Sequence, residues 1–183
     1  MAQTERDQAT VRTLLADNVA GDISPVDLRD ALASLMGYGS MVLTTSGQPA
    51  TLNSVSTTPV LIDVYDSITA QSIDVNNSGI TATLAPDYAF TIGSTGVYKV
   101  TFWTSFSSSG NNELVTFYPF VDDIQGLVES DRWISTVGDT GSTGFSYIAS
   151  HTAGGVIDIR VKLDSGTSNL TFLGAGFNIF RVG

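Results

Sequence analysis

Cysteine is absent from this chain of 183 residues, and histidine occurs once, at His151. The chain therefore has no disulfide framework and needs no oxidising compartment in which to form one. Without thiolates, and with a single imidazole, it also lacks the ligands of a multi-histidine or cysteine-based metal site. Its stability must come from packing or from association between subunits.

Positive charge is also scarce, because 8 Lys and Arg side chains oppose 18 Asp and Glu side chains, giving a net charge of -10. The few basic residues are dispersed, so the chain lacks the electrostatic footprint of a nucleic-acid-binding protein. No apolar run approaches the roughly 20 residues that cross a bilayer, and the polar start MAQTERDQAT does not resemble a secretory signal. We expect no nucleic acid partner, no membrane partner, and synthesis in a cytoplasm.

Hydroxyl side chains take the place of the missing charges: 43 residues are Ser or Thr. The most informative segment runs from Gly96 to Asp122, where two strand-like stretches flank a short Ser, Gly and Asn turn. In the first stretch, Tyr98, Val100 and Phe102 alternate with more polar residues, which is the period of a half-buried strand. The pattern predicts a central β-hairpin, with Pro119 marking an edge or a bulge in its second strand.

Two helical patterns precede the β-rich region. The first begins near Thr4, and the second begins at Ser24-Pro25, a cap followed by proline at the first helical position. Such a hairpin is too short to be stable alone and needs a partner surface. We predict an anchor and linker over residues 1–45 and a β domain over residues 46–183, with Met41 to Thr58 as an extended arm. The candidate anchor residues are Val11, Leu14, Leu15, Leu28, Leu32 and Leu35.

Short strand candidates then follow one another, separated by Gly, Asn, Asp and Ser turns. They span residues 60–65, 71–75, 80–84, 88–92, 132–137, 144–151, 156–163 and 170–182, besides the central hairpin. Many strands with close turns and no intervening helix are typical of a sandwich or a closed barrel.

In order, these strands resemble the jelly roll of the complement globular heads and the tumour necrosis factor superfamily. The likeness is carried by the pattern G-x-Y-x-V-x-F at residues 96–102 and by the segments at 114–120, 145–150, 155–163 and 175–181. The resemblance implies a two-sheet jelly roll that assembles as a homotrimer through aromatic and aliphatic side chains. The candidate trimer-interface residues are Trp103, Tyr118, Phe120 and Phe177, while a core position for Trp103 remains an equal alternative.

The helical segment LLADNVAGDISPVDLRDALASL, residues 14–35, separately resembles segments of bacteriophage fibre and appendage proteins. Together the two resemblances imply a structural protein on the virion surface, a homotrimeric capsid decoration or head-fibre protein. Residues 1–45 would bind the major capsid protein or another virion protein. One alternative is a tail-fibre tip that recognises a host glycan through residues 107–112 and 138–144. The other is a bacterial surface or spore-coat binding module of the same fold.

Catalytic patterns are sparse, so we expect neither an enzyme nor a cofactor. Residue counting alone leaves open a Ser-His-Asp arrangement with His151, but the chain contains no G-x-S-x-G motif. The ordinary interpretation of His151 is a strand-end residue near a turn or a subunit boundary. Asp122 and Asp123, with Glu129 and Asp131, or Asp63 with Asp66, could offer oxygen ligands to calcium. Their spacing matches no EF-hand loop, so a solvated acidic loop is the simpler explanation.

Overall fold

A computed structural model describes residues 37–43, 50–71 and 80–182. Of residues 67–71 it describes the backbone only. The described residues form strands and contain no helix. The strands are β1 (Tyr38–Val42), β2 (Ala50–Val55), β3 (Val60–Leu61), β4 (Ser67–Gln71), β5 (Ile80–Thr83), β6 (Ala89–Ile92), β7 (Gly96–Ser108), β8 (Glu113–Val121), β9 (Ile124–Gln125), β10 (Ser130–Ile134), β11 (Thr140–His151), β12 (Val156–Leu163) and β13 (Ser168–Arg181).

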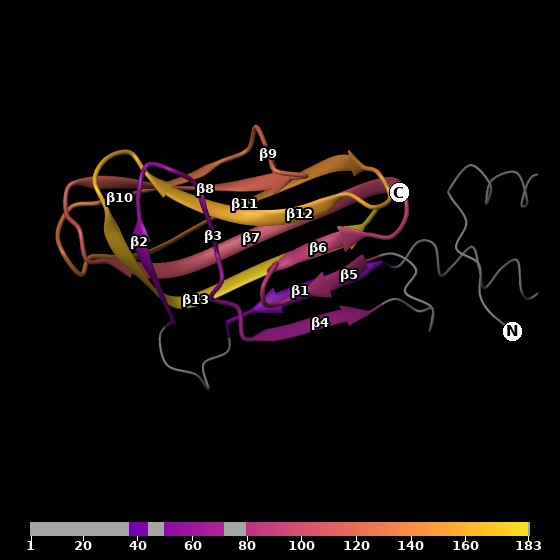
Figure 1. Cartoon of the computed structure of the whole chain (residues 1–183), viewed down its shortest axis with the longest axis horizontal. Helices are drawn as coiled ribbons and strands as arrows, with labels where there is room; N and C mark the ends of the chain where they lie inside the picture. The colour runs from indigo at the N-terminus through magenta and orange to yellow at the C-terminus, as the bar shows by residue number, and fades with distance from the viewer. Residues whose placement is uncertain (1–36, 44–49, 72–79, 183) are drawn as a thin grey trace, which may run out of the picture.

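The strands are arranged in two antiparallel sheets whose long strands run along the length of the domain (Figure 1). Sheet A has the order β11-β7-β13-β1-β4, and β2 also pairs with β13. Sheet B has the order β10-β8-β12-β6-β5, with β3 added beside β12 and β9 beside β8. The predicted all-β, two-sheet architecture is therefore present in the described residues.

The core lies between the two sheets and is filled by alternate side chains of the long strands. Tyr98, Val100 and Phe102 of β7 point inward and are almost completely buried, as the two-residue period predicts. Across the core, the ring of Phe117 on β8 lies 5.3 Å from those of Phe102 and Phe106. Aromatic contacts between the sheets thus hold the sandwich together at its centre.

The predicted central hairpin is wrong in one respect, because β7 and β8 do not pair with each other. Strand β7 pairs with β11 and β13 in sheet A, whereas β8 pairs with β10 and β12 in sheet B. Each strand has one strongly apolar face, and these faces pack against each other. The turn between them therefore carries the chain from one sheet to the other.

The segment predicted as an extended arm, residues 41–58, contains the end of β1 and all of β2. β1 lies between β13 and β4 inside sheet A, with Met41 fully buried, although it precedes the domain boundary predicted at residue 46. β2 pairs with the start of β13. The predicted helical hairpin and all six candidate anchor residues lie outside the described residues.

The local edge expected at Pro119 is present. β10 pairs with β8 only as far as Phe117, and the carbonyl of Pro119 accepts a hydrogen bond from the N–H of Gly126. β9 pairs with β8 again from Phe120. Because N–H and C=O of one strand residue point to the same side, the missing N–H of Pro119 faces the gap between these two pairings.

The buried carboxylate of Glu113 connects the end of β7 to the start of β13 through hydrogen bonds. The side chain of Glu113 is buried, and its two oxygens accept hydrogen bonds from the hydroxyls of Ser108 and Ser168, the latter at 2.7 Å. Ser108 Oγ also accepts from the N–H of Gly110 at 3.1 Å. A Cβ at Gly110 would overlap the carboxylate, so this turn requires glycine.

Substitution Glu113→Ala should lower the free energy of unfolding by about 1–3 kcal/mol, because it leaves two buried hydroxyls without their acceptor. The matched control is Glu129→Ala, which removes an exposed carboxylate and should have an effect within about 0.5 kcal/mol. Urea unfolding followed by tryptophan fluorescence measures both. Equal stabilities of the two variants would contradict a structural role for Glu113.

Candidate functional site

The outer face of sheet A is the most distinctive surface of the described residues. Paired strands align its side chains in rows that cross the sheet. One row consists of Tyr38, Phe180, Lys99 and Ile148, and the rings of Tyr38 and Phe180 are in tilted contact with centroids 4.8 Å apart. Phe180 is 41% exposed and Ile148 is 63% exposed. Large apolar side chains therefore remain open to solvent on this face.

The next row is polar and made of short side chains. The hydroxyl of Ser40 donates to Asn178 Oδ1 at 2.6 Å, and the hydroxyls of Thr101 and Ser146 lie 3.2 Å apart. The hydroxyl groups of these pairs form hydrogen bonds within the sheet, and their short side chains project little above it. They leave a flat surface between the apolar row and the tryptophan beyond it.

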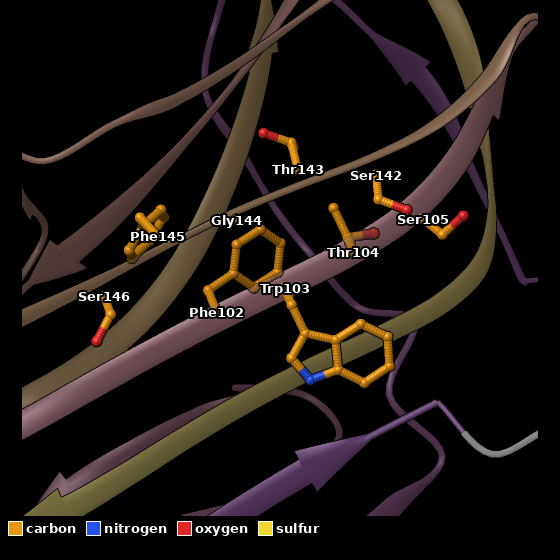
Figure 2. Close-up of a pocket in the computed structure, with 9 residues that line it drawn as sticks. All are labelled: Phe102, Trp103, Thr104, Ser105, Ser142, Thr143, Gly144, Phe145 and Ser146. Atoms are coloured by element: carbon orange, nitrogen blue, oxygen red, sulfur yellow. The ribbon is translucent and has the colours of Figure 1, made fainter.

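Trp103 lies flat on sheet A because glycines surround it (Figure 2). Its partner in β13 is Gly176, where a Cβ would overlap the indole nitrogen, and a Cβ at Gly174 would lie 3.3 Å from the ring. On the other side its partner in β11 is Gly144. The indole leans over β13, is 45% exposed, and borders a shallow hollow of about 480 Å³ above β7 and β11.

The strands of sheet A contain no Asp or Glu, although the chain carries a net charge of -10. Of their basic residues, Arg181 is buried, with its guanidinium bound to Ser94 Oγ and Thr95 O. Lys99 is thus the one charged side chain on the outer face among the described strand residues. Its ammonium group stands within an otherwise uncharged surface.

The structure separates the four candidate interface residues. Trp103 lies on the outer face of sheet A, which excludes the alternative of a core tryptophan. Tyr118 and Phe120 lie on the outer face of sheet B, 5% and 7% exposed. Phe177 is fully buried in the core, where its ring lies 4.6 Å from that of Phe90. Phe177 therefore has no surface to offer a neighbouring subunit.

A β-bulge explains why the sequence misplaced Phe177. The register of β13 shifts between Phe172 and Gly174, which adds one residue and reverses the alternation. Phe172 and Phe177 consequently both point inward although five positions separate them. Leu173 and Phe180 are left on the outer side, and the sequence analysis had not selected either of them. Regular alternation continued from Phe172 through the bulge would place Phe180 inward, so it could not have found this residue.

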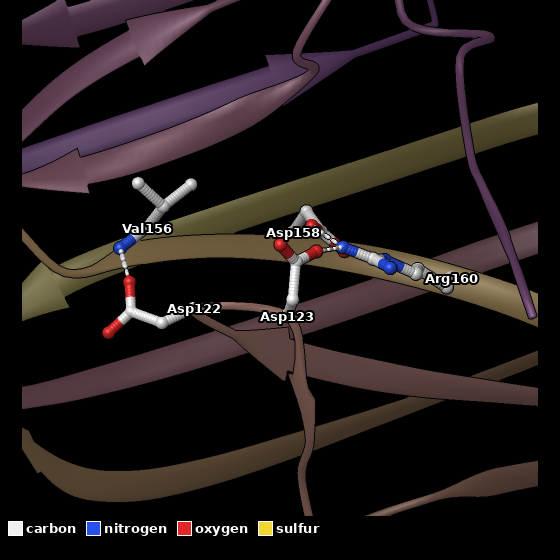
Figure 3. A network of polar contacts seen from close by, with 5 residues as sticks. All are labelled: Asp122, Asp123, Val156, Asp158 and Arg160. Atoms are coloured by element: carbon white, nitrogen blue, oxygen red, sulfur yellow. Dashed lines mark hydrogen bonds and ion pairs between the residues drawn. The ribbon is translucent and has the colours of Figure 1, made fainter.

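Tyr118 and Phe120 are covered by cations of the same chain. Lys162 Nζ lies 5.0 Å from the centre of the Tyr118 ring, and the Arg160 guanidinium lies 4.3 Å from that of Phe120. Arg160 Nε and Nη2 donate to the two carboxylate oxygens of Asp158 at 2.9 and 2.8 Å (Figure 3). Nη2 also donates to Asp123. The hydrogen bonds with Asp158 are the main reason that the pKa of Arg160 is raised. These aromatic rings are therefore already packed within the monomer.

Two of the acidic residues considered for calcium, Asp122 and Asp123, bind other groups of the same chain. Asp123 pairs with Arg160, and Asp122 Oδ1 accepts a hydrogen bond from the N–H of Val156 at 2.8 Å (Figure 3). A hollow of about 440 Å³ lies nearby and is lined in part by Arg160, Asp123 and Asp158. The guanidinium of Arg160 already forms ion pairs with both of these carboxylates. Within the described residues, no group of three His, Cys, Asp or Glu side chains is placed to hold a metal.

His151 is the last residue of β11 and pairs with Gly96, so the strand-end position expected for it is confirmed. The side chain is buried between the rings of Tyr98 and Tyr147, with centroid distances of 6.1 and 6.2 Å. Burial lowers the pKa of His151, and the nearby Asp122 carboxylate partly opposes this. Burial also raises the pKa of Tyr147 to about 12.

The two sheets and their strand order define the chain as a jelly roll. Its fold matches that of the tumour necrosis factor Eiger from S. frugiperda, with a TM-score of 0.55 at 15% identity, over 81% of this chain and 93% of that one. It also matches the globular domain of zebrafish complement 1qA, with a TM-score of 0.52 at 15% identity, over 80% of this chain and 98% of that one. The fold expected from the sequence resemblance is therefore confirmed.

At 15% identity these likenesses concern the fold and not the function. No protein-family model and no curated protein sequence matches the chain. Within its described residues, there is also no helix with the length and apolar character needed to span a membrane.

Replacing Phe177 by Ala should lower the free energy of unfolding by about 3–5 kcal/mol, the cost of a large cavity in a packed core. Phe180→Ala, three residues further along the same strand, removes a partly exposed ring and should cost about 1 kcal/mol or less. Denaturant unfolding of both variants at low protein concentration measures the difference. A larger loss for Phe180→Ala would contradict the register of β13 after the bulge.

Proposed function

We propose that the chain is a non-enzymatic structural protein whose jelly roll self-associates through the outer face of sheet A as a homotrimer. The observation that carries this proposal is the composition of that face. It exposes Trp103, Ile148, Leu173 and Phe180 together on one face, whereas Tyr118 and Phe120 on the outer face of sheet B are covered by cations. Exposed apolar surface of this extent is typical of an interaction site.

Electrostatics supports a second copy of the chain as the partner. Two copies of a protein with a net charge of -10 repel each other, and this repulsion is weaker when the contact surfaces are free of acidic groups. The strands of sheet A meet this condition, whereas Glu113, Asp131 and Asp158 are in the strands of sheet B. Contact through sheet A would keep most of the described carboxylates away from the interface.

The shape of the face also suits a close contact. Its central rows contain Gly144, Gly174 and Gly176 beside short hydroxyl side chains, so a partner backbone could approach without meeting long flexible groups. Trp103 lies on the glycines with little freedom to lose on binding. A large, rigid aromatic in such a position is typical of an interface hot spot.

Threefold symmetry and a place on the virion surface come from the sequence resemblances. The jelly-roll pattern implies a homotrimer, and residues 14–35 resemble bacteriophage appendage segments. We therefore propose a capsid decoration or head-fibre protein that residues 1–45 attach to the major capsid protein or another virion protein. Three anchors on one trimer would strengthen attachment by avidity without any new contact.

Light scattering on the purified chain should give a mass of about three times 19.3 kDa. Trp103→Ser should weaken association, raising the dissociation constant by about tenfold or more, because it removes an aromatic anchor worth about 2 kcal/mol. Trp133→Ser is a matched control, since Trp133 is 50% exposed but lies on a strand of sheet B. Equal effects of the two substitutions would contradict the choice of sheet A.

Removal of residues 1–36 should leave the mass of the assembly three times that of the shortened chain while abolishing its attachment to particles. The cut is placed before β1 because removal of residues 1–40 would take Tyr38 and Ser40 from sheet A. Sedimentation with particles that carry the protein measures attachment. A shortened chain that is monomeric would mean that the N-terminal segment, and not sheet A, holds the subunits together.

A glycan-binding tip is the second candidate function, favoured by the environment of Trp103. An exposed indole lying flat beside the hydroxyls of Ser105, Ser142 and Ser146 resembles a platform on which a sugar ring could stack. In this case the same face would stay open, and the protein would be a monomer or would assemble through another surface. Light scattering of the wild type and of Trp103→Ser therefore distinguishes the two candidates, because only assembly through sheet A should be weakened by the substitution.

A further inference from the structure

His151 occupies an unusual position for the only imidazole in the chain. It is 7% exposed, and its Nε2 atom is buried with no hydrogen-bond partner among the described residues. The hydroxyl of Tyr147, on the same side of β11, is likewise buried and unpartnered. A neutral imidazole can leave one nitrogen without a bond at modest cost, but an imidazolium has two N–H donors to satisfy.

The surroundings of His151 offer little to stabilise a positive charge. The titratable groups beside it are Tyr98 of β7, Tyr147 of β11 and Asp122 after β8. The hydroxyl of Tyr98 donates to Ser94 O at 2.6 Å, and Asp122 already accepts a hydrogen bond from Val156. Arg181 of β13, opposite Tyr98, brings a positive charge to the same end of the sandwich. A protonated His151 would therefore tend to leave its buried site.

The alternation of β11 connects this buried site to the outer face of sheet A. Tyr147 and His151 point inward, while Ile148 and Ser150 of the same stretch point outward. In sheet A, β11 is the terminal strand and pairs only with β7, so this end of the strand is held from one side. Movement of His151 toward solvent would displace Ile148 from the exposed apolar row.

We propose that His151 makes self-association of the chain sensitive to acid, because its protonation opens the C-terminal end of β11 and displaces Ile148 from the contact between subunits. This inference rests on the self-association proposed above. The direction follows from linkage: burial holds the pKa of His151 below the ordinary value of 6.5. Neutral His151 therefore stabilises the closed end of β11 fully above about pH 6.5, and this contribution is lost as pH falls from there through the lower pKa of the folded subunit.

The experiment compares the intact chain with His151→Phe by light scattering, from about pH 7.5 to about pH 5.5. Phenylalanine keeps an aromatic ring against Tyr98 and Tyr147 but cannot take a proton. For the wild type, we expect the association constant to fall as acid is added, by up to about tenfold per subunit for each pH unit between the pKa of His151 in the free subunit and its lower pKa in the assembly. The variant should lose less. His151→Gln, also neutral, serves if the phenylalanine variant does not fold.

A second readout follows the proton directly. Because the chain has one histidine, the imidazole C–H resonance in a proton NMR titration reports on His151 alone. Its midpoint should coincide with the pH at which the mass of the wild type falls. Parallel loss of assembly in the wild type and in the neutral variants, or no loss in either, would overturn this inference and leave the proposed assembly intact. A wild-type monomer at neutral pH would overturn both.

Discussion

Strand β7 is the element on which the other features of this molecule depend. It is hydrogen-bonded along both sides, to β11 and to β13, and it separates the core from the outer face of sheet A. Because successive side chains of a strand point to opposite faces, its inward and outward residues are subject to different constraints. Tyr98, Val100 and Phe102 fill the space between the sheets, whereas Lys99, Thr101 and Trp103 occupy the outer surface. The residues paired with Trp103 are glycines, Gly144 of β11 and Gly176 of β13, and a side chain at Gly176 would overlap the indole.

The environments of Tyr118 and Phe120 on the outer face of sheet B differ from that of Trp103 on the outer face of sheet A. On sheet B, the rings of Tyr118 and Phe120 are covered by Lys162 and Arg160, whose own charges are balanced in part by Asp158 and Asp123. On sheet A, no long cationic side chain covers Trp103, because its neighbours in β11 and β13 are glycines. On the first face these two rings are therefore packed within one subunit. The second leaves apolar surface that another molecule can cover.

Much of the fold could be predicted from the sequence, because it depends on local alternation. The inward residues of β7 and the local edge at Pro119 follow from rules that concern a few neighbouring residues. The pairing of β7 and β8 could not be predicted in this way, because a short turn is compatible both with a hairpin and with a crossing between sheets. Only the long-range pairing of β8 with β12 and of β7 with β13 decides between them.

The candidate site was harder to predict, since it depends on the relation between strands that are distant in sequence. Trp103 was selected because it opposes the core residues of β7, and that reasoning requires one strand only. Phe177 was selected wrongly because the bulge after Phe172 is invisible to a regular two-residue period. Tyr118 and Phe120 were selected as candidates for a contact between subunits, and only the pairing of β8 with β12 places Arg160 and Lys162 over them.

The distribution of charge explains how a strongly acidic chain could still present a surface suited to its own copies. Screening in physiological salt reduces interactions beyond about 8 Å, so the distance between carboxylates at a contact matters more than the total charge. Most described carboxylates lie in loops or on sheet B, and the strands of sheet A contribute none. Net charge can then keep separate assemblies apart while the uncharged face remains available for contact. The acidity of the chain is thus compatible with the proposed self-association, because the strands of sheet A carry none of the described carboxylates.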